Sequence, residues 1–403
     1  MCVETDRHPE TTGAPSTLPP RPRMGHIEFL NCFPLLWGLA RAGSLADLDL
    51  IKDTPDNLSD ALARGALDIG PISVLELLKN TDELVVLPDI AIGSDGPVMS
   101  CLIISRLPLH RLDALPVALG STSRTAVRLA RLLLSDLIGV QPQYFCCPPD
   151  LTSMLQQAPA AVLIGDTALH AALYEAPRLN LDVHDLGQMW RDWTGLPFVF
   201  AVYAAHRDFA EREPDTVHRV HTHLLHARDL SLANIDQVCR QAAHSQTFDI
   251  ATLKQYYTTA LDFTLNDRHL SGIAEFTRRT AGPHSGFPPQ VQLQLLQNRI
   301  YPDGQVGGGG NSMAPVGDQV TVARVVDRLR ETVATVLELD VEEVTVDALF
   351  YEDLEVDSLH KTEISARVER EFHVRIDPEG WAAIRTITDV LTLLHDKGVL
   401  IDE

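Results

Sequence analysis

A glycine-rich segment near residue 310 sets the strongest limit on how this chain can fold. The stretch YPDGQVGGGGNSMAPVG, residues 301 to 317, holds four consecutive glycines flanked by Pro, Asn and Ser. No helical or strand pattern of apolar side chains runs through it, and its composition predicts a flexible tether. The tether divides the 403 residues into a body and a tail, and a chain of this length is too long for one ordinary core.

The distribution of charge also separates the tail from the body. The whole chain has a formal net charge of -22, and residues 316 to 403 contain 21 Asp and Glu against 9 Lys and Arg. Binding to nucleic acid requires a basic surface, so this balance excludes that class of partner. We therefore expect no nucleic-acid partner, and we treat the tail as a separate acidic unit.

The first 23 residues are polar and rich in Pro and Thr. They predict a disordered leader, because they lack the apolar stretch of a signal peptide. No run in the chain approaches the roughly 20 apolar residues of a membrane helix. We expect a cytoplasmic protein with no membrane partner, made of a leader (1–23), a body (24–300), a linker (301–317) and a tail domain (318–403).

Within the body, short β-rich runs alternate with longer amphipathic runs. The β-rich runs are HIEFLN, LDIGPIS, LVVLPDIAIG, SCLIIS, PVALG, AAVLIG and FVFAVYAA, and TAVRLARLLLSDLIG is typical of the helical runs. This alternation predicts an α/β fold with largely parallel sheets. The size of the body allows two lobes, and a two-lobed α/β protein binds its ligand in the crevice between them.

The most informative junction in the body is VALGSTSRTAVRLA, residues 117 to 130. An apolar strand ends at Gly120, and Ser121, Thr122 and Ser123 follow before a helix begins. Backbone amides, hydroxyl groups and the helix dipole at such a place suit an anion. The same three residues are also common helix caps, so anion binding and simple capping both remain open.

Four further polar residues occupy similar positions. Asp166 follows a strand and Gly165, where it is either a helix cap or a group facing the crevice. Asn31 lies where the first β-rich run ends, as a turn residue or as an amide that contacts a ligand. Ser100 and Ser73 adjoin two other buried runs. All four are candidate site residues.

Several common chemistries have no support in the sequence. It contains no G-x-G-x-x-G, Walker loop, H-E-x-x-H or G-x-S-x-G pattern. The histidine-rich run HRVHTHLLH, residues 218 to 226, has no Cys or carboxylate to complete a metal site, so we interpret it as a solvated helix surface. We expect no metal.

The body resembles the chorismate dehydratase family of the futalosine route to menaquinone, which has a periplasmic-binding-protein-like fold. The segments that carry the resemblance are GHIEFLNCFPLLWGLARAG, KDTPDNLSDALARGALDIGPIS, DGPVMSCLIIS, VALGSTSRTAVRLA, VLIGDTAL and WTGLPFVFAVYAA. The last of these would cross between the lobes. The resemblance implies elimination of water from chorismate to give 3-[(1-carboxyvinyl)oxy]benzoate, with the substrate's own enolpyruvyl carboxylate taking the proton.

The resemblance also assigns roles to the candidate residues. It implies that Asn31 contacts the reacting region of a chorismate-like substrate. It implies that Ser100 and the loop Ser121, Thr122 and Ser123 bind that substrate. Ser73 and Asp166 stay as further candidates for the cleft.

The tail reads as a helical domain. TVARVVDRLRETVATVLEL carries valines and leucines on one face, and DSLHKTEISARVEREF begins with Asp357 as an expected helix cap. In the second run Leu359, Ile364, Val368 and Phe372 are expected to point inward. Read without any relative, Ser358 in the D-S-L triplet is an ordinary first-turn residue.

The acidity, length and helix order of the tail resemble an acyl or peptidyl carrier protein, an all-α four-helix bundle. This resemblance implies that Ser358 carries 4′-phosphopantetheine, attached by a phosphopantetheinyl transferase. It also implies that an acidic face with Glu363, Glu369 and Glu371 docks acyl-loading or synthase enzymes. Glu355 departs from the glycine usual in carriers, which bears on the choice of partner.

The fusion leaves three functional readings. The first is a chorismate dehydratase joined to a carrier, serving specialised polyketide or peptide biosynthesis or a menaquinone-related route. In the second, the body acts on a substrate bound to a carrier, with the tether raising its local concentration. The third is a ligand-binding or scaffold protein without catalysis.

Overall fold

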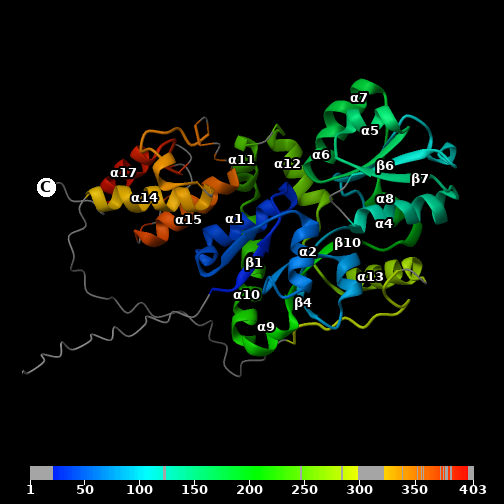
Figure 1. Cartoon of the computed structure of the whole chain (residues 1–403), viewed down its shortest axis with the longest axis horizontal. Coiled ribbons are helices and arrows are strands. Elements are labelled where there is room, and N and C mark those ends of the chain that lie inside the picture. The colour runs from blue at the N-terminus through cyan, green and yellow to red at the C-terminus, as the bar shows by residue number, and fades with distance from the viewer. Residues whose placement is uncertain are drawn as a thin grey trace, which may run out of the picture.

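The computed structural model describes most of the body and much of the tail. The described residues are 21–120, 124–245, 247–282, 285–297, 322–337, 339–351, 353, 354, 356, 358–372, 374, 376, 380, 381 and 384–397. Two lobes, each built on a mixed sheet, make up the body, and a helical unit lies beside the first lobe (Figure 1). The two-lobed α/β class predicted for the body is therefore confirmed.

The first lobe contains a five-stranded sheet in the order β2-β1-β3-β10-β4. Its strands are β1 (Arg23–His26), β2 (Asp49–Lys52), β3 (Ile69–Ser73), β4 (Leu84–Ser94) and β10 (Phe198–His206). The second lobe contains a sheet in the order β7-β6-β8-β5-β9. Its strands are β5 (Cys101–Ser105), β6 (Pro116–Gly120), β7 (Gln143–Cys147), β8 (Ala160–Ile164) and β9 (Asp182–Asp185).

The expectation of largely parallel sheets was wrong. β1 pairs in parallel with β2 and β3, but β10 runs antiparallel to β3 and β4. In the second sheet β6 is parallel to β7 and β8, whereas β5 is antiparallel to β8 and β9. β5 and β10 are the strands that enter a lobe from the other lobe, so they run opposite to strands whose carboxyl ends face the crevice.

In the part of the body that the structure describes, the chain crosses between the lobes at two places. One leads from β4 to β5, and the other leads from α8 (Leu186–Thr194) through Gly195 and Pro197 into β10. Gly195 ends α8 with φ of 73°, a left-handed conformation that glycine adopts without strain. The structure thus places the segment WTGLPFVFAVYAA at a crossing, as expected.

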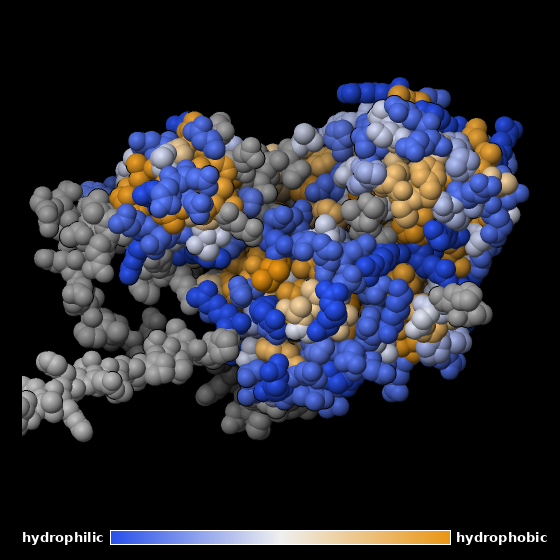
Figure 2. Space-filling model, viewed as in Figure 1, coloured by the Kyte–Doolittle hydropathy of each residue, from blue (hydrophilic) through white to orange (hydrophobic). Residues whose placement is uncertain are grey.

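Helices cover the sheets of both lobes. Those of the first half of the body are α1 (Phe33–Arg41), α2 (Pro55–Ala63), α3 (Val74–Lys79), α4 (Arg124–Leu132), α5 (Leu151–Gln157), α6 (Gly165–His170) and α7 (Ala176–Leu179). After α8 follow α9 (Arg207–Arg212), α10 (Pro214–Ala233), α11 (Ile235–Ser245), α12 (Ile250–Gln255) and α13 (Asp267–Thr280). Hydrophilic residues cover much of the visible face of both lobes (Figure 2).

Local sequence explains where several helices begin. Thr54 caps α2 by accepting a hydrogen bond from the Asn57 amide at 3.4 Å, and Pro55 occupies the first helical position. Asp150 caps α5 in the same way through the Ser153 amide. These caps satisfy backbone donors that a helix start otherwise leaves unpaired.

The histidine-rich run lies on α10, and its interpretation as a solvated surface was wrong in part. His221 is buried, and its Nε2 lies 2.8 Å from the carbonyl oxygen of Pro88. Burial lowers the pKa of His221, so the neutral ring is favoured there. His226 is exposed, as a solvated surface requires.

The tail is helical in the residues that the structure describes. It contains α14 (Val322–Leu337), the short turn η7 (Val341–Glu343), α15 (Ser358–Glu371) and α17 (Ile387–Asp396). Its own apolar core includes the expected inward residues Ile364, Val368 and Phe372, together with side chains of α14 such as Leu329. In all of the described residues, no helix has the length and apolar character needed to span a membrane.

Candidate active site

Asn31 lies in η1 (Leu30–Cys32), a single 3₁₀ turn at the start of α1. The first strand was expected to extend to this residue, but β1 ends at His26. The buried side-chain oxygen Oδ1 of Asn31 has no hydrogen-bond partner among the described residues. A buried polar atom without a partner costs free energy, and a ligand at this place would remove that cost.

A direct contact between the lobes lies beside Asn31. The backbone N–H of Leu30, in the first lobe, donates to the Asp166 carboxylate with distances of 3.0 Å to Oδ1 and 3.3 Å to Oδ2. Asp166 lies in the first turn of α6, in the second lobe. The structure therefore brings Asn31 and Asp166 to one place, although they are far apart in sequence.

Gly165 makes this contact possible. Its φ is +64°, and a Cβ atom there would lie 3.1 Å from Cδ2 of the Phe29 ring. Any side chain would strain the backbone and press against Phe29. The glycine before Asp166 is thus required by the approach of the two lobes as well as by the local turn.

The surroundings of Asp166 favour its neutral form. Burial raises the pKa of Asp166 to about 6, and the hydrogen bond from Leu30 opposes this shift only in part. Burial and the nearby Asp166 charge also raise the pKa of the Cys32 thiol to about 12. Cys32 is therefore a neutral, packed side chain, whereas Asp166 changes its protonation close to neutral pH.

Ser100 provides a hydroxyl group at the same edge of the second sheet. Its carbonyl accepts a hydrogen bond from Gly165 N at 2.7 Å, because β5 begins where β8 ends. The Ser100 side chain is 2% exposed, and its Oγ accepts a hydrogen bond of 2.8 Å from the Tyr256 hydroxyl. The sequence-predicted residue Ser100 is thus joined by a backbone hydrogen bond to Gly165, the residue that precedes Asp166.

Two tyrosines in this region were not identified from the sequence. Tyr256 and Tyr257 begin the π-helical turn η6 (Tyr256–Ala260), with their ring centres 5.6 Å apart. The Tyr257 residue is fully buried, and its hydroxyl has no hydrogen-bond partner among the described residues. The only local signal is the Tyr-Tyr pair itself, which core packing explains equally well.

Ser73 has a structural role in this arrangement. Its side chain caps α3 by accepting from the Glu76 amide at 3.4 Å. Next to this cap, Leu75 N donates to Thr125 Oγ1 in the second lobe at 3.0 Å. Ser73 therefore lies beside a second contact between the lobes.

The predicted anion loop Ser121, Thr122 and Ser123 lies outside the described residues. The residues on either side of it are described, with β6 ending at Gly120 and α4 beginning at Arg124. The start of α4 is thus close to the second contact between the lobes.

Arg124 forms an ionic link across the lobes. Its guanidinium makes two hydrogen bonds to Asp60, at 2.6 and 2.8 Å, and lies 3.2 Å from Glu76 and 3.7 Å from Asp56. This bonding lowers the pKa of Asp60. Arg124 belongs to the second lobe, and its guanidinium contacts three carboxylates of the first lobe. Its charge therefore serves to hold the two lobes together.

The residues at the contact between Asn31 and Asp166 define what chemistry is available there. An amide oxygen, hydroxyl groups and one carboxyl group of raised pKa are present, while Arg124, at the second contact between the lobes, is engaged by carboxylates. Such a set can hold and orient a polar ligand by hydrogen bonds in a place shielded from water. In the described part of the chain, no cluster of three or more His, Cys, Asp or Glu side chains forms a metal site.

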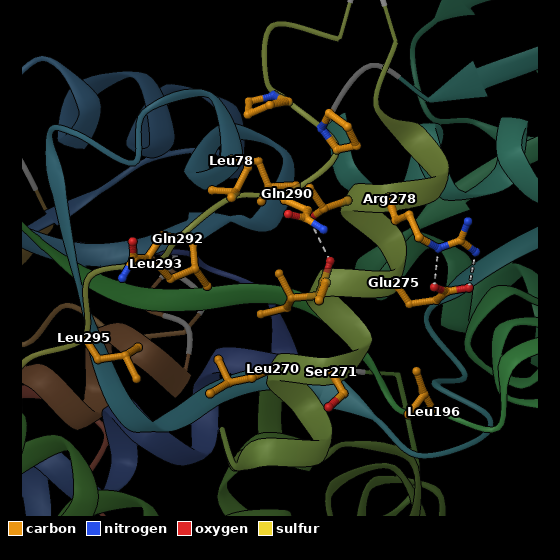
Figure 3. Close-up of a pocket in the computed structure, with 16 residues that line it drawn as sticks. Leu78, Leu196, Leu270, Ser271, Glu275, Arg278, Gln290, Gln292, Leu293 and Leu295 are labelled. Atoms are coloured by element: carbon orange, nitrogen blue, oxygen red, sulfur yellow. Dashed lines mark hydrogen bonds and ion pairs between the residues drawn. The ribbon is translucent and has the colours of Figure 1, made fainter.

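A large groove elsewhere in the body is not this site. It has a volume of about 850 Å³ and lies between α13 and the segment 288–295 (Figure 3). Leu270, Leu293 and Leu295 line it, and the ion pair of Glu275 with Arg278 lies at its side. Its described lining includes none of the sequence-predicted site residues.

In the tail, Ser358 is the first residue of the 14-residue helix α15. A helix N-terminus presents free amides and the positive end of the dipole, which fits the phosphate of a phosphopantetheine group. Asp357 and Glu355, and the side chains of Ser358, Leu359 and Glu371, lie outside what the structure describes.

The expected acidic docking face of α15 is not free. Glu363 is buried and lies 3.3 Å from Lys52 of the first lobe. Glu369 is half-buried and accepts a hydrogen bond from Ile376 N at 2.7 Å, within the tail itself. The prediction of a face open to other enzymes was therefore wrong for Glu363, because the body covers it.

These features define a class: a two-lobed protein with a periplasmic-binding-protein-like fold, joined to a helical carrier domain. A family model described as "Menaquinone biosynthesis" matches residues 22–282, and one described as "Phosphopantetheine attachment site" matches residues 327–394. The chain belongs to the menaquinone biosynthesis family, and it also carries a phosphopantetheine attachment domain. 4′-Phosphopantetheine is accordingly the cofactor of the tail.

Comparison with individual proteins agrees with both assignments. A chorismate dehydratase of Thermus thermophilus is 31% identical over 196 residues, which cover 43% of this chain and 71% of that protein. The polyketide-8 synthase acyl carrier protein 2 of Streptomyces avermitilis is 45% identical over 80 residues, which cover 20% of this chain and 92% of that protein.

A solved structure supports the fold. A Candida albicans gene product described as having the generic periplasmic binding protein fold gives a TM-score of 0.50 at 12% identity. The match covers 70% of this chain and the whole of that one. At this identity the likeness concerns the fold alone, and it confirms the predicted fold class.

Proposed function

We propose that the body eliminates water from chorismate or a close analogue to give 3-[(1-carboxyvinyl)oxy]benzoate. The observation that carries this proposal is the unpartnered amide oxygen of Asn31 beside the closed contact of the lobes. The likeness of the body to a chorismate dehydratase supports the choice of substrate. The carrier domain then holds an acyl group through phosphopantetheine on Ser358.

In this reaction the bond between C3 and its hydrogen breaks, and its electron pair completes the aromatic ring. The bond between the neighbouring C4 and its hydroxyl oxygen also breaks, and the hydroxyl leaves as water after taking a proton. The proton from C3 passes to the enolpyruvyl carboxylate of the substrate, which gives it up to the leaving hydroxyl, so that the elimination needs no other proton source. Formation of the aromatic ring supplies the driving force, so the protein has mainly to orient the substrate.

The described side chains suit that task. The Asn31 amide and the Ser100 hydroxyl can bind polar groups of the substrate, and Tyr256 holds the Ser100 hydroxyl in place. Closure of the lobes excludes water, which strengthens these hydrogen bonds. Ser121, Thr122 and Ser123 are proposed to bind a carboxylate at the start of α4, and Ser73 supports the cleft as a helix cap.

Asp166 makes the proposed reaction dependent on pH. The substrate is a dianion, and an ionised carboxylate beside it would repel it. We therefore expect substrate to bind to the form in which Asp166 is protonated, whose pKa is about 6. kcat/KM then falls as the pH rises above this value, and Asp166→Asn removes this dependence while keeping an acceptor for Leu30 N.

The proposal is tested with the purified full chain and chorismate. Chromatography with mass detection is expected to show an aromatic enolpyruvyl product, and Asn31→Ala or Ser100→Ala is expected to lower kcat/KM by about 100-fold. The control Ser271→Ala changes an exposed serine on α13 and keeps full activity. Binding of chorismate without turnover would instead identify a ligand-binding or scaffold protein.

A second candidate function is elimination on a substrate attached to the carrier. The observation that favours it is the position of α15 against the first lobe, where Glu363 pairs with Lys52 at the end of β2. Under this reading Ser358→Ala abolishes turnover of the carrier-bound substrate, whereas turnover of free chorismate requires no carrier.

Modification of the carrier is tested separately. After incubation with a phosphopantetheinyl transferase and coenzyme A, the mass of the chain is expected to increase by one phosphopantetheinyl group. Ser358→Ala prevents the increase. An unmodified chain under conditions that modify a control carrier contradicts the assignment of Ser358. The pathway served, specialised or menaquinone-related, follows from which acyl group is then loaded.

A further inference from the structure

The carrier domain contacts the body through helix α15. Figure 1 shows α15 beside α1, and η2 (Ser44–Asp47) and α11 of the first lobe also pack against it. Ala366 of α15 is 6% exposed and belongs to the apolar core of the body, whereas Ile364 and Val368 belong to the core of the carrier. Helix α15 therefore has two buried faces, one inside the carrier and one against the body.

A hydrogen-bonded chain of three side chains crosses this contact. Gln241, on α11, accepts a hydrogen bond of 3.0 Å from Trp37 Nε1 through its Oε1. The Trp37 N–H can only donate, so the amide orientation of Gln241 is determined. Its Nε2 then donates to Thr362 Oγ1 on α15. Each polar end of the Gln241 amide is thus matched, one in the body and one in the carrier.

An ion pair lies on the same face. Lys52 Nζ, at the end of β2, is 3.3 Å from Glu363 Oε2 and 3.7 Å from Glu28 Oε1. The side chains of Lys52 and Glu363 are 16% and 6% exposed. Arg367, one turn along α15, also binds the Glu363 carboxylate at 2.8 Å. A carboxylate this deeply buried is tolerated because both of its cationic partners are present.

The Lys52 contact connects the carrier to β2, the edge strand of the sheet in the first lobe. Lys52 pairs in register with His26, the last residue of β1, and Glu28 follows two residues later on the way to Asn31. Glu363 is five residues after Ser358, which is about 7.5 Å along a helix axis. The docked helix therefore holds the start of α15 near the edge of the first lobe.

From these contacts we propose that the face formed by α1, η2, α11 and Lys52 is a docking site for the protein's own carrier domain. In the docked state Thr362, Glu363 and Ala366 are covered by the body. An enzyme that binds this part of α15 therefore competes with the body. The carrier domain has to dissociate from the body before such an enzyme can bind. The tether makes the docking intramolecular, so a contact of modest strength is sufficient.

The docking is tested by reversing charges in the full chain. Lys52→Glu and Glu363→Lys each place like charges together, and both are expected to release the carrier. Released chains have a larger radius of gyration in small-angle X-ray scattering and faster amide hydrogen exchange in α11 and α15, by about tenfold for a loss of about 1.4 kcal/mol. The double variant Lys52→Glu with Glu363→Lys restores this ion pair, and because Glu28 and Arg367 then face like charges it is expected to recover the compact form in part.

Matched controls separate docking from folding. Glu331→Lys makes the same change of charge at an exposed site on α14 and is expected to keep the parent radius and exchange rates. Glu363→Lys changes the carrier itself and could disturb its folding, whereas Lys52→Glu leaves the carrier sequence unaltered. An effect of Lys52→Glu on α15 therefore reports release of the carrier from the body. Single variants that match the parent, or a double variant that resembles the single ones, overturn the proposal.

Competition for α15 is measured with the same Lys52→Glu protein. Because its carrier domain is unchanged, the initial rate of phosphopantetheinyl transfer reports access to the carrier. The rate is expected to rise when the body releases α15, and an equal rate refutes the covering of α15. These results stand whether or not the body proves to be a dehydratase.

Discussion

Replacing Asp166 by Asn tests the electrostatics of the contact between the lobes. The ordinary pKa of an aspartate is 3.8, and burial raises that of Asp166 to about 6. A shift of two units corresponds to about 3 kcal/mol at 1.36 kcal/mol per unit, and partial exposure reduces the expected value to between about 1 and 3 kcal/mol. This is the free energy that the folded protein loses when Asp166 ionises.

The sign follows from proton binding. The folded protein holds the Asp166 proton more tightly than the unfolded chain does, so this group stabilises the fold below pH 3.8. That contribution is lost as the pH rises through about 6. Asparagine cannot ionise and still accepts a hydrogen bond from Leu30 N. The variant is therefore expected to gain between about 1 and 3 kcal/mol relative to the parent from pH 4 to pH 7.

The assay is urea unfolding at several pH values, followed by tryptophan fluorescence. Both proteins carry Trp381→Phe, so that fluorescence reports the body and not the carrier. Asp150→Asn is the matched control, since Asp150 is an exposed helix cap whose pKa is lowered by hydrogen bonds to Ser153. If the free energy of unfolding changes equally in the parent and in Asp166→Asn between pH 4 and 7, ionisation of Asp166 does not destabilise the folded protein and the prediction is wrong.

Three further substitutions probe the same region. Gly165→Ala combines a left-handed backbone with a clash against Phe29, and we expect thermal or urea unfolding to show a loss of about 1 to 3 kcal/mol. Arg124→Gln removes the guanidinium that binds Asp60 and lies beside Asp56 and Glu76, for an expected loss of about 1 to 2 kcal/mol. This loss is expected to shrink in 1 M salt, and a salt-independent loss would contradict an ionic origin. Tyr256→Phe removes the donor to Ser100, so a stability loss of about 1 kcal/mol and a lower kcat/KM are expected; unchanged kinetics would place Tyr256 in the core alone.

The predicted strands show what apolar patterning can and cannot detect. Buried strands such as β3, β6 and β8 were found, because each is a continuous apolar run. The strands β2, β7 and β9 were missed, and all three lie at the edge of a sheet. An edge strand has a neighbour on one side only and is partly exposed, so its sequence needs no apolar run.

The site residues show a similar division. Asn31, Ser100 and Asp166 were predicted because each follows or precedes a recognisable strand, and their part in binding a substrate stays a prediction. Tyr256 and Tyr257 were missed, since no local motif marks them and their role depends on contact with distant residues. Ser73 stays a predicted cleft residue, and the structure adds that its hydroxyl caps α3.

By itself, the sequence determined the division into body and carrier, the α/β class of the body and the helical character of the tail. These properties depend on composition and on the spacing of apolar residues within a short segment, and both can be read from the local sequence. Tertiary structure alone decided that Asp166 meets Leu30, that Arg124 is held by the opposite lobe and that Glu363 is buried beside Lys52. Each of these contacts joins residues that are far apart in the sequence. Local sequence does not determine which distant residues meet, so these contacts could not be predicted from it.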